Sequence, residues 1–172
     1  MKRNIYKEQR VGVFIDIQNL YYSSKHLYKK KVNFKAVLDE AVNNRTLIRA
    51  IAYVVRADEL KENTFFEALE NIGFDIQEKE LQIFAGGMKK GDWDVGIAVD
   101  TIKMAQKLDV VVLVSGDGDY APLVEYLKNA QGCRVEVMAF GRSTSSKLRD
   151  VADEFIDLDS NKKYLLPSYS IS

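Results

Sequence analysis

Continuous apolar runs alternate along the chain with segments in which apolar residues recur every three or four positions. The unbroken runs 11–15 and 110–114 are typical of strands that are covered on both faces. Apolar residues at every third or fourth position indicate helices that pack one apolar face on such a sheet. The β-type segments are 11–15, 47–55, 74–76, 81–84, 110–114, 134–140 and 154–158, and the helical segments are 34–42, 58–71, 92–105, 119–130 and 145–151.

Strands that alternate with helices predict an α/β fold with a central, mostly parallel sheet and helices on both faces. The pattern does not specify the order of the strands. No long Gly, Ser or Pro linker divides the chain, so we expect one domain over residues 11–160. A polar segment, 1–10, precedes this domain, and residues 161–172 are expected to form a loose tail.

Local signals refine this scheme. Segment 19–28 is rich in aromatic residues and is expected to be a loop or a short helix, whereas 85–91 is expected to be a loop. Asp58 and Asp92 are placed to cap the helices that follow them, and Gly73 is placed to end the first of these helices. The helix after Asp92 carries Val95, Ala98, Ile102 and Ala105 on one side.

Composition narrows the classes of function. The 172 residues suit one domain, and the formal net charge of zero argues against a general nucleic-acid coating protein while allowing a local basic patch. With one cysteine and one histidine, the chain has neither an intramolecular disulfide nor a Cys/His zinc site nor a Ser-His-Asp triad. The polar N-terminus, and the lack of any run near the ~18 apolar residues of a membrane helix, predict a cytoplasmic protein without membrane contact.

Aspartates follow the two most apolar strands. Asp16 follows the first run, Asp117 and Asp119 follow the run 110–114, and Asp94 lies near a helix start. Because parallel strands end at one edge of a sheet, where ligands bind, we expect these side chains to meet. Two like charges about 4 Å apart cost roughly 4 kcal/mol at an effective dielectric of 20, and a divalent cation removes that cost. Carboxylate oxygens suit Mg²⁺ or Mn²⁺, so the sequence predicts a metal-dependent acidic site.

Each of these aspartates also has a local structural explanation as a helix cap or turn residue. Asn19, one short turn after Asp16, could bond that carboxylate, a water or a phosphate, and the hydroxyl of Ser115 could join the site. Local capping is the alternative for both. Asp100 lies six residues after Asp94, off the same helical face, so it either supports the site from behind or is a solvated helix position.

Three motifs taken together resemble the NYN domain family in its bacterial LabA-like branch, over about residues 11–157. They are Asp16-Ile-Gln-Asn19, Lys90-Gly-Asp-Trp-Asp94-Val-Gly-Ile-Ala-Val-Asp100 and Ser115-Gly-Asp-Gly-Asp119-Tyr-Ala-Pro122. The family is similar to PIN-domain nucleases. The resemblance therefore implies a PIN-like Rossmannoid three-layer sandwich and a Mg²⁺- or Mn²⁺-dependent ribonuclease that hydrolyses RNA phosphodiester bonds.

The resemblance also implies roles for individual residues. By position, the four aspartates match the family's acidic residues, and are expected to be both catalytic and metal-binding. Asn19 matches the family's asparagine and joins the catalytic set, whereas Asp100 matches a further acid with a supporting role. The residues so assigned are Asp16, Asp94, Asp117, Asp119, Asn19 and Asp100.

An RNA partner, expected to be single-stranded, requires cationic contacts with its phosphates. We expect Lys89, Lys90 and Arg142 to supply them, because all three lie in loops near the predicted acidic edge. Lys25 and Lys29 to Lys31 form a second basic cluster. Tyr21 and Tyr22 could stack on bases, but we expect them to be core residues. The sequence leaves open whether the protein forms a homodimer.

Two other classes of function compete with a ribonuclease. The first is a phosphatase-type hydrolase, which would carry Asp-x-Asp after its first strand, but Gln18 occupies the third position here. A receiver-type phosphotransfer domain fits the Gly-Asp-Gly-Asp turn equally poorly. The second class is a binding module, in which the acidic pocket holds a metal and the basic edge binds RNA or a protein without cleavage.

Overall fold

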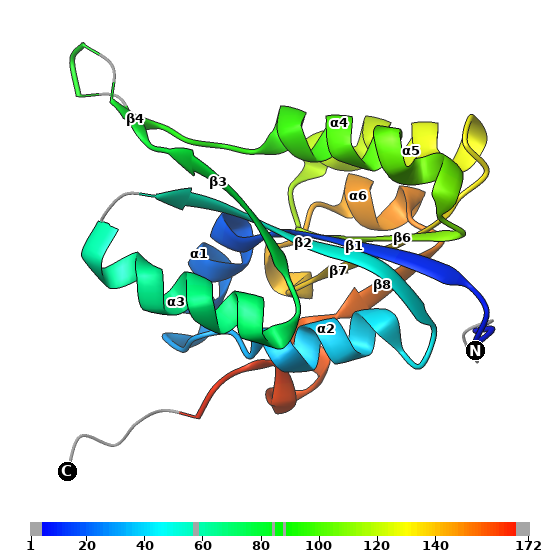
Figure 1. The fold of residues 1–172 in the computed structure, drawn as a ribbon, viewed down its shortest axis with the longest axis horizontal. Helices are drawn as coiled ribbons and strands as arrows, with labels where there is room; N and C mark the ends of the chain where they lie inside the picture. Colours follow the sequence, from blue (N-terminus) through cyan, green and yellow to red (C-terminus); the bar gives the residue numbers. More distant parts are fainter. Residues whose placement is uncertain (1–4, 57–58, 84, 88, 168–172) are drawn as a thin grey trace.

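Six parallel strands form the central sheet of the computed structural model, which describes all residues except 1–4, 57–58, 84, 88 and 168–172 (Figure 1). The strand order is β3-β2-β1-β6-β7-β8. A short antiparallel ribbon, β4 (Gln82–Ile83) with β5 (Lys89–Lys90), lies outside this sheet. The strands of the sheet are β1 (Arg10–Asp16), β2 (Thr46–Arg56), β3 (Asp75–Glu80), β6 (Val110–Val114), β7 (Arg134–Ala139) and β8 (Glu154–Asp157).

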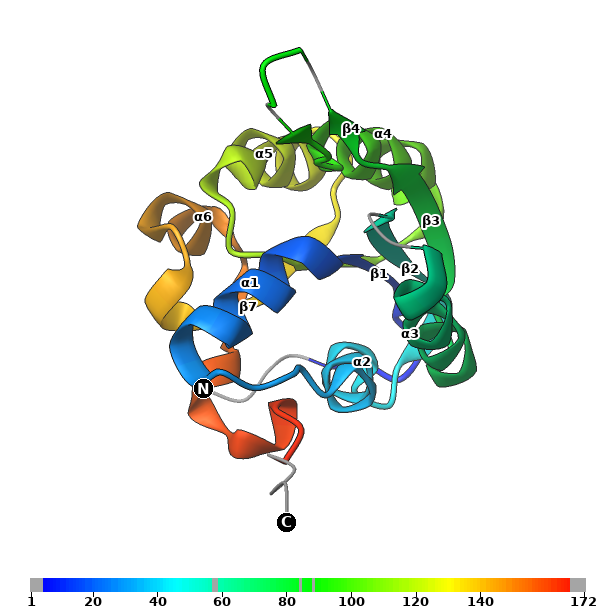
Figure 2. The ribbon, with the colours of Figure 1, turned by 90° about the vertical axis from the view of Figure 1, so that its left-hand side faces the viewer.

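Helices cover both faces of the sheet, which completes the three-layer α/β fold expected from the sequence (Figures 1 and 2). One face is covered by α1 (Ile17–Tyr28), α2 (Phe34–Val42) and α3 (Glu59–Ile72). The opposite face is covered by α4 (Asp94–Met104), α5 (Ala121–Asn129) and α6 (Ser146–Val151). In the parts of the chain that the structure describes, no helix is long and apolar enough to span a membrane.

Strand β1 shows why the sheet is apolar on both faces. Val11, Val13 and Ile15 pack against the α1–α3 layer, whereas Phe14 packs against the α4–α6 layer. Gly12 also faces the second layer, where an added Cβ would lie 2.5 Å from the end of the Leu108 side chain, so a larger residue here would force that side chain to shift. All of β6 is buried, in agreement with its unbroken apolar run.

The strand order of the sheet reverses between β1 and β6, which makes this a topological switch point. Successive strands are added on one side from β1 to β3, and the chain then crosses back to place β6 on the other side of β1. The ends of the two central strands adjoin, since Ile15 pairs with Val114. In open α/β sheets, ligands bind beyond the strand ends at such a switch point. The topology therefore places the residues after β1 and β6 at the position where a ligand site is expected.

Two expectations about local structure were incomplete. Residues 17–28 form a full helix, because Asp16 caps its start by accepting the Asn19 N–H, and Lys29 ends it in a left-handed conformation. Lys89 and Lys90 form β5 instead of a loop. Gly73 follows α3 with φ of 125°, as expected of a helix-ending glycine, whereas Asp58 lies outside the described residues.

The start of α4 also differs from the expectation. Its N-cap residue is Trp93 instead of Asp92. The Trp93 indole N–H donates to the Val54 carbonyl at 2.8 Å, and the ring packs on Tyr53 with centroids 5.3 Å apart. The buried residues of α4 are Ile97 and Thr101. Val95 and Ile102, which the sequence placed on one apolar side, are both exposed, Val95 by 75%.

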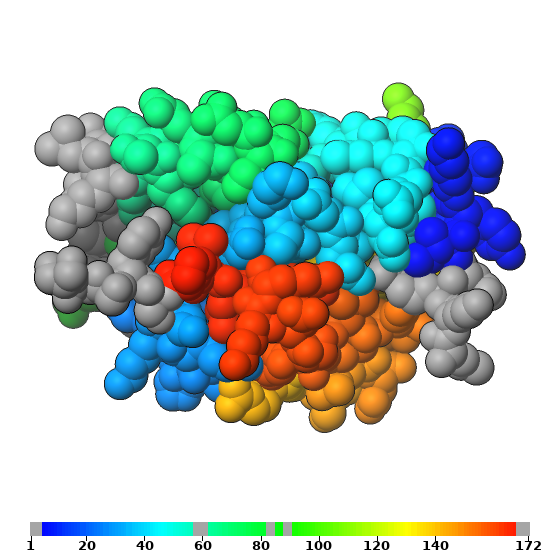
Figure 3. All heavy atoms as spheres, turned by 90° about the horizontal axis from the view of Figure 1, so that it is seen from below, coloured from blue at the N-terminus to red at the C-terminus, as the bar shows by residue number. Residues whose placement is uncertain are grey.

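The expectation of a loose tail was wrong for residues 161–166. Tyr164 is buried, and its carbonyl accepts the Asn33 N–H at 2.8 Å. The Leu166 N–H donates to the Lys31 carbonyl at 2.8 Å. Figure 3 shows this segment, in red, lying against the surface of α2. The hydrophobic residues of this segment are too few to show a periodicity, but the buried Tyr164, the bridge between Leu165 and Val32, and the backbone hydrogen bonds hold it in place.

Candidate functional site

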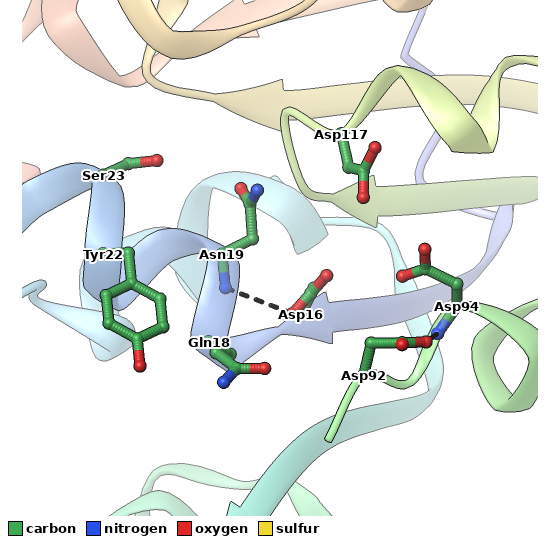
Figure 4. A pocket seen from close by; sticks show the side chains of 8 residues that line it. All are labelled: Asp16, Gln18, Asn19, Tyr22, Ser23, Asp92, Asp94 and Asp117. Carbon is green, nitrogen blue, oxygen red and sulfur yellow. Dashed lines mark hydrogen bonds between the residues drawn. The ribbon is translucent and has the colours of Figure 1, made fainter. Parts of the chain in front are cut away.

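A cleft of about 410 Å³ opens at the switch point between β1 and β6. Figure 4 shows that carboxylates gather on one side of it and side chains of α1 on the other. This cleft is lined by Asp16, Gln18, Asn19, Tyr22, Ser23, Asp92, Asp94 and Asp117.

The four aspartates singled out in the sequence come together here from three separate elements. Asp16 ends β1, Asp94 begins α4, and Asp117 caps the 3₁₀ helix η2 (Gly118–Tyr120) by accepting the Asp119 N–H at 2.9 Å. Asp94, Asp117 and Asp119 each offer a carboxylate oxygen, and these oxygens lie within 4.8 Å of one another. Asp16 lines the same cleft as Asp94 and Asp117.

Tyr120 connects Asp16 to Asp94. Its side chain is buried, and its hydroxyl lies 3.0 Å from Asp94 Oδ1 and 3.3 Å from Asp16 Oδ2. A phenol has one hydrogen, so it donates to one of these two carboxylates at a time. The sequence analysis did not assign this residue, although its place directly after Asp119 in the third motif was a usable signal.

Asn19 and Ser115 hold the acidic loop in place. The Asn19 side-chain oxygen accepts the Gly116 N–H at 3.0 Å, which fixes the loop after β6 to the first turn of α1. The buried Ser115 hydroxyl accepts the Asp117 N–H at 3.2 Å. The Ser115 contact is local capping, whereas the Asn19 contact joins two separate segments of the chain, and Asn19 additionally lines the cleft.

Close packing behind this loop explains its glycines. The Gly116 carbonyl accepts the Ser145 N–H at 3.1 Å. A Cβ added at Gly118 would lie 2.6 Å from the Ser145 hydroxyl oxygen, a distance that real Cβ atoms do not tolerate. The segment before α6 thus supports the loop that presents Asp117 and Asp119.

Burial makes the negative charge in this cleft costly. Burial of the Asp16 carboxyl, reinforced by the charges of Asp94 and Asp117, raises its pKa to about 6, although the Asn19 N–H and the Tyr120 hydroxyl oppose the shift. Burial and the neighbouring Asp117 also raise the pKa of Asp94. Perturbed acids that converge in a cleft are typical of sites that bind or react.

Asp100 lies behind the cleft, one of its two expected places, whereas Asp92 has a place that was not expected. Asp100 accepts a hydrogen bond from the buried Tyr53 hydroxyl at 2.8 Å, and is not among the residues that line the cleft. It acts behind the site, because Tyr53 packs on Trp93, which precedes Asp94. Asp92, expected only as a helix cap, lines the cleft with its exposed carboxylate.

Among the expected basic residues, Arg142 is not one of the residues that line the acidic cleft. Arg142 belongs to the 3₁₀ helix η3 (Gly141–Ser143), pairs with Asp159 at 3.5 Å, and lies over the Tyr28 ring at 4.9 Å. Lys89 and Lys90 belong to the β4–β5 hairpin, whose backbone projects beyond the ends of β2 and β3 (Figure 1). Arg142 is therefore engaged within the protein.

The two tyrosines of α1 are not core residues, contrary to the expectation. Tyr21 is 46% exposed and Tyr22 is 59% exposed. The core face of α1 consists of Ile17, Leu20 and Ser24, so the helix turns both aromatic rings outward. The wrong assignment arose because an aromatic residue buries well, and the sequence does not show which face of a short helix meets the sheet.

The fold and the site define a parallel α/β domain with an acidic cleft at its topological switch point. The chain belongs to the nuclease-like NYN domain family, whose model matches residues 10–159. It is 26% identical over 170 residues to the Low amplitude and bright protein LabA of Synechococcus elongatus, covering 93% of this chain and 89% of that protein. It is also similar to the crystal structure of a protein of unknown function from Vibrio parahaemolyticus RIMD 2210633, with a TM-score of 0.86 and 32% identity over 96% of this chain and 100% of that one.

Proposed function

We propose that this protein is a Mg²⁺- or Mn²⁺-dependent ribonuclease that hydrolyses phosphodiester bonds of single-stranded RNA in the cleft between β1 and β6. The observation that carries the proposal is the approach of Asp94, Asp117 and Asp119 oxygens to within 4.8 Å of one another. Asp16 faces the same space. The names of the similar proteins specify no reaction, so the chemistry rests on the cleft itself.

The donor atoms suit a hard divalent cation. The acids that converge offer only carboxylate oxygens, which are the ligands that Mg²⁺ and Mn²⁺ prefer. Among the described residues that line the cleft, none is a lysine or arginine, so no cationic side chain of this described wall neutralises the acids. Burial, together with repulsion from neighbouring acids, raises the pKa of Asp16 and Asp94, and a cation would favour their charged forms. Asp16, Asp94, Asp117 and Asp119 are the residues that would hold it.

A bound cation would supply Lewis acidity toward a phosphoryl oxygen and lower the pKa of a water molecule. The protein's own residues fix the geometry for this chemistry. Asn19 holds the loop after β6, and the Tyr120 hydroxyl orients the carboxylates of Asp16 and Asp94. The chain needs no histidine base, in agreement with the absence of histidine from the lining of the cleft.

The test is cleavage of end-labelled single-stranded RNA with Mg²⁺, with Mn²⁺, and with EDTA. We expect cleavage by the wild-type protein only with a divalent cation, and none by Asp117→Asn. Asp39→Asn is the matched control, because this exposed aspartate lies on α2, is not among the residues that line the cleft, and pairs with Lys35 at 2.8 Å.

Two outcomes would contradict the proposal. If folded wild-type protein binds Mn²⁺ but leaves RNA intact, the acidic cleft belongs to a binding module. If it releases phosphate from a small monoester while sparing RNA, a phosphatase-type hydrolase is the better assignment.

A further inference from the structure

The outward face of α1 forms the wall of the cleft opposite the aspartates (Figure 4). Gln18, Asn19, Tyr22 and Ser23 line it. Their spacing of three and four residues places them in one stripe, since such residues are neighbours on a helix surface. The core-facing stripe of the same helix consists of Ile17, Leu20 and Ser24. The cleft therefore has an acidic wall and a wall with an aromatic ring flanked by amide and hydroxyl groups.

Tyr22 is poorly explained by the needs of the fold. Its side chain is 59% exposed, and within the described part of the chain its ring contact is the edge of Tyr21, with centroids 5.5 Å apart. An exposed ring beside a polar cleft offers a flat apolar face to a ligand. Single-stranded nucleic acids use such faces for base stacking, which tolerates any base.

Charge changes sign along α1. The helix begins at the acidic Asp16, and Lys25, His26 and Lys29 lie exposed at its other end. Tyr22 lies six residues after Asp16, roughly 9 Å along the axis, and Lys29 lies roughly 10 Å further. A nucleic acid with one phosphate at the aspartates could therefore contact the ring of Tyr22 with the adjoining nucleotide, and Lys25 and Lys29 with later phosphates.

We propose that Tyr22 is the stacking subsite for the base of a nucleotide next to the scissile phosphate, and that single-stranded RNA runs from the acidic cleft along α1 toward Lys25 and Lys29. This inference rests on the proposed ribonuclease function and adds the place and orientation of the strand. Gln18 and Ser23, on either side of the ring, offer hydrogen-bond donors and acceptors to the stacked nucleotide.

The experiment measures binding separately from cleavage. Fluorescein-labelled RNA hexamers are titrated with protein in Ca²⁺, with gels to verify that the RNA stays intact, and each hexamer carries one abasic residue at a different position. Tyr22→Ala should weaken binding of the complete hexamer by ~5-fold or more, because loss of one base–aromatic stack has about that effect. Tyr22→Trp should retain binding. Tyr126→Ala, which removes an exposed tyrosine of α5 on the opposite layer, is the matched control and should bind like the wild type.

The abasic series tests the same contact from the RNA side. At one position, removal of the base should weaken binding by the wild-type protein as much as Tyr22→Ala does, and should leave binding by that variant unchanged. The subsite is overturned if Tyr22→Ala binds like the wild type, or if no abasic position distinguishes the two proteins. Cleavage with Mn²⁺, measured in parallel, separates the two proposals. Tyr22-dependent binding without cleavage overturns the ribonuclease alone, and cleavage without Tyr22-dependent binding overturns the subsite alone.

Discussion

At the scale of single residues, the charge on Asp16 is the most costly in the cleft. This carboxyl is buried at the end of β1, and its partners are one backbone N–H and the hydroxyl of Tyr120. The neighbouring Asp94 and Asp117 are also negative, so the folded protein favours the protonated form of Asp16. The cost of this arrangement should be measurable in the metal-free protein.

We expect the stability of the metal-free protein to fall as pH rises from about 4 to about 6. Asp16 has a folded-state pKa of about 6, above the value of about 3.9 in an unfolded chain, so the folded state binds the extra proton in this window. At pH values above this window, the free energy of unfolding should be lower than at about pH 4 by on the order of 3 kcal/mol. Urea denaturation in EDTA across this range should show the decline in the wild type and a smaller one in Asp16→Asn. Equal declines in both proteins would refute this account of Asp16.

A second residue-scale prediction concerns metal binding. A ligand that binds only the folded state at 100 times its dissociation constant adds about 2.7 kcal/mol of stability. Mg²⁺ or Mn²⁺ should raise the melting temperature of the wild type and of Asp39→Asn, but not of Asp117→Asn. Without metal, Asp117→Asn should be no less stable than the wild type, because it removes one charge from beside Asp94 and Asp119. A normal metal response in this variant would exclude Asp117 as a ligand.

At the scale of elements, the acidic loop depends on the segment that packs behind it. The loop after β6 is fixed to α1 through Asn19 and to the start of α6 through Ser145. Neither contact is made within the loop itself. Displacement of either neighbour should therefore move Asp117 and Asp119 without unfolding the protein.

Gly118→Ala should disrupt the loop, because the new Cβ would meet the Ser145 side chain at 2.6 Å. Overpacking of this kind typically lowers the free energy of unfolding by about 1–3 kcal/mol. It should also abolish the stabilisation by Mn²⁺, so that the variant melts at the same temperature with and without the metal. The double variant with Ser145→Gly should recover the metal response, because Ser145 makes no side-chain cap hydrogen bond to α6. Failure of the double variant to recover would mean that Ser145 is not the obstacle.

The β4–β5 hairpin is the element for which we propose phosphate contacts. Each phosphate neutralised on a single strand contributes about −0.7 to the slope of log affinity against log salt. Lys89→Ala with Lys90→Ala should therefore weaken RNA binding and flatten this slope by roughly one to two units. The matched control is the double variant Lys103→Ala, Lys107→Ala, which should leave the slope unchanged. Both lysines are exposed, Lys103 in the last turn of α4 and Lys107 in the 3₁₀ helix η1 (Ala105–Lys107) that follows it. If the Lys89→Ala, Lys90→Ala variant keeps the wild-type slope, the hairpin makes no phosphate contact, and Lys25 and Lys29 at the end of α1 remain the proposed ones.

At the scale of the whole molecule, a buried ion pair joins the two halves of the sheet. Arg45, between α2 and β2, donates to Glu136 of β7 at 2.8 Å, and both side chains are fully buried. Arg134 also contacts Glu136 at 3.0 Å. The pair links the α1–α3 layer to a strand on the far side of β1, so it contributes to the placement of the switch point.

Arg45→Met should destabilise the protein by about 3 kcal/mol or more, because it leaves the Glu136 carboxylate buried with less compensation. Arg49→Met is the matched control, since Arg49 pairs with Asp75 at 2.8 Å on the surface, and its loss should cost about 1 kcal/mol or less. Both values follow from urea denaturation at neutral pH. Similar losses for the two variants would show that burial does not set the cost.

The sequence by itself determined the elements and the acids. Apolar periodicity is a local property, so it revealed β1, β6 and the helices α2 to α4 between them, but it left α1 as a loop or a short helix. The position of Asp16 and Asp117 after strands placed both at one edge of the sheet. Only the tertiary structure decided the strand order, and with it that β1 and β6 are neighbours. That neighbourhood depends on contacts between segments about a hundred residues apart, which no local pattern records.

The same reason accounts for the residues that the sequence did not assign correctly. Tyr120 reaches Asp16 only because β1 and β6 are adjacent, and Tyr22 faces the cleft only because α1 packs on the sheet through Ile17 and Leu20. Packing among all layers decides which face of a helix is buried. It also decides whether a segment that looks like a tail, such as the one around Tyr164, is covered by the rest of the protein. Residue types and their spacing therefore defined the chemistry of this protein, whereas the packing of its layers defined the shape of the cleft in which that chemistry is placed.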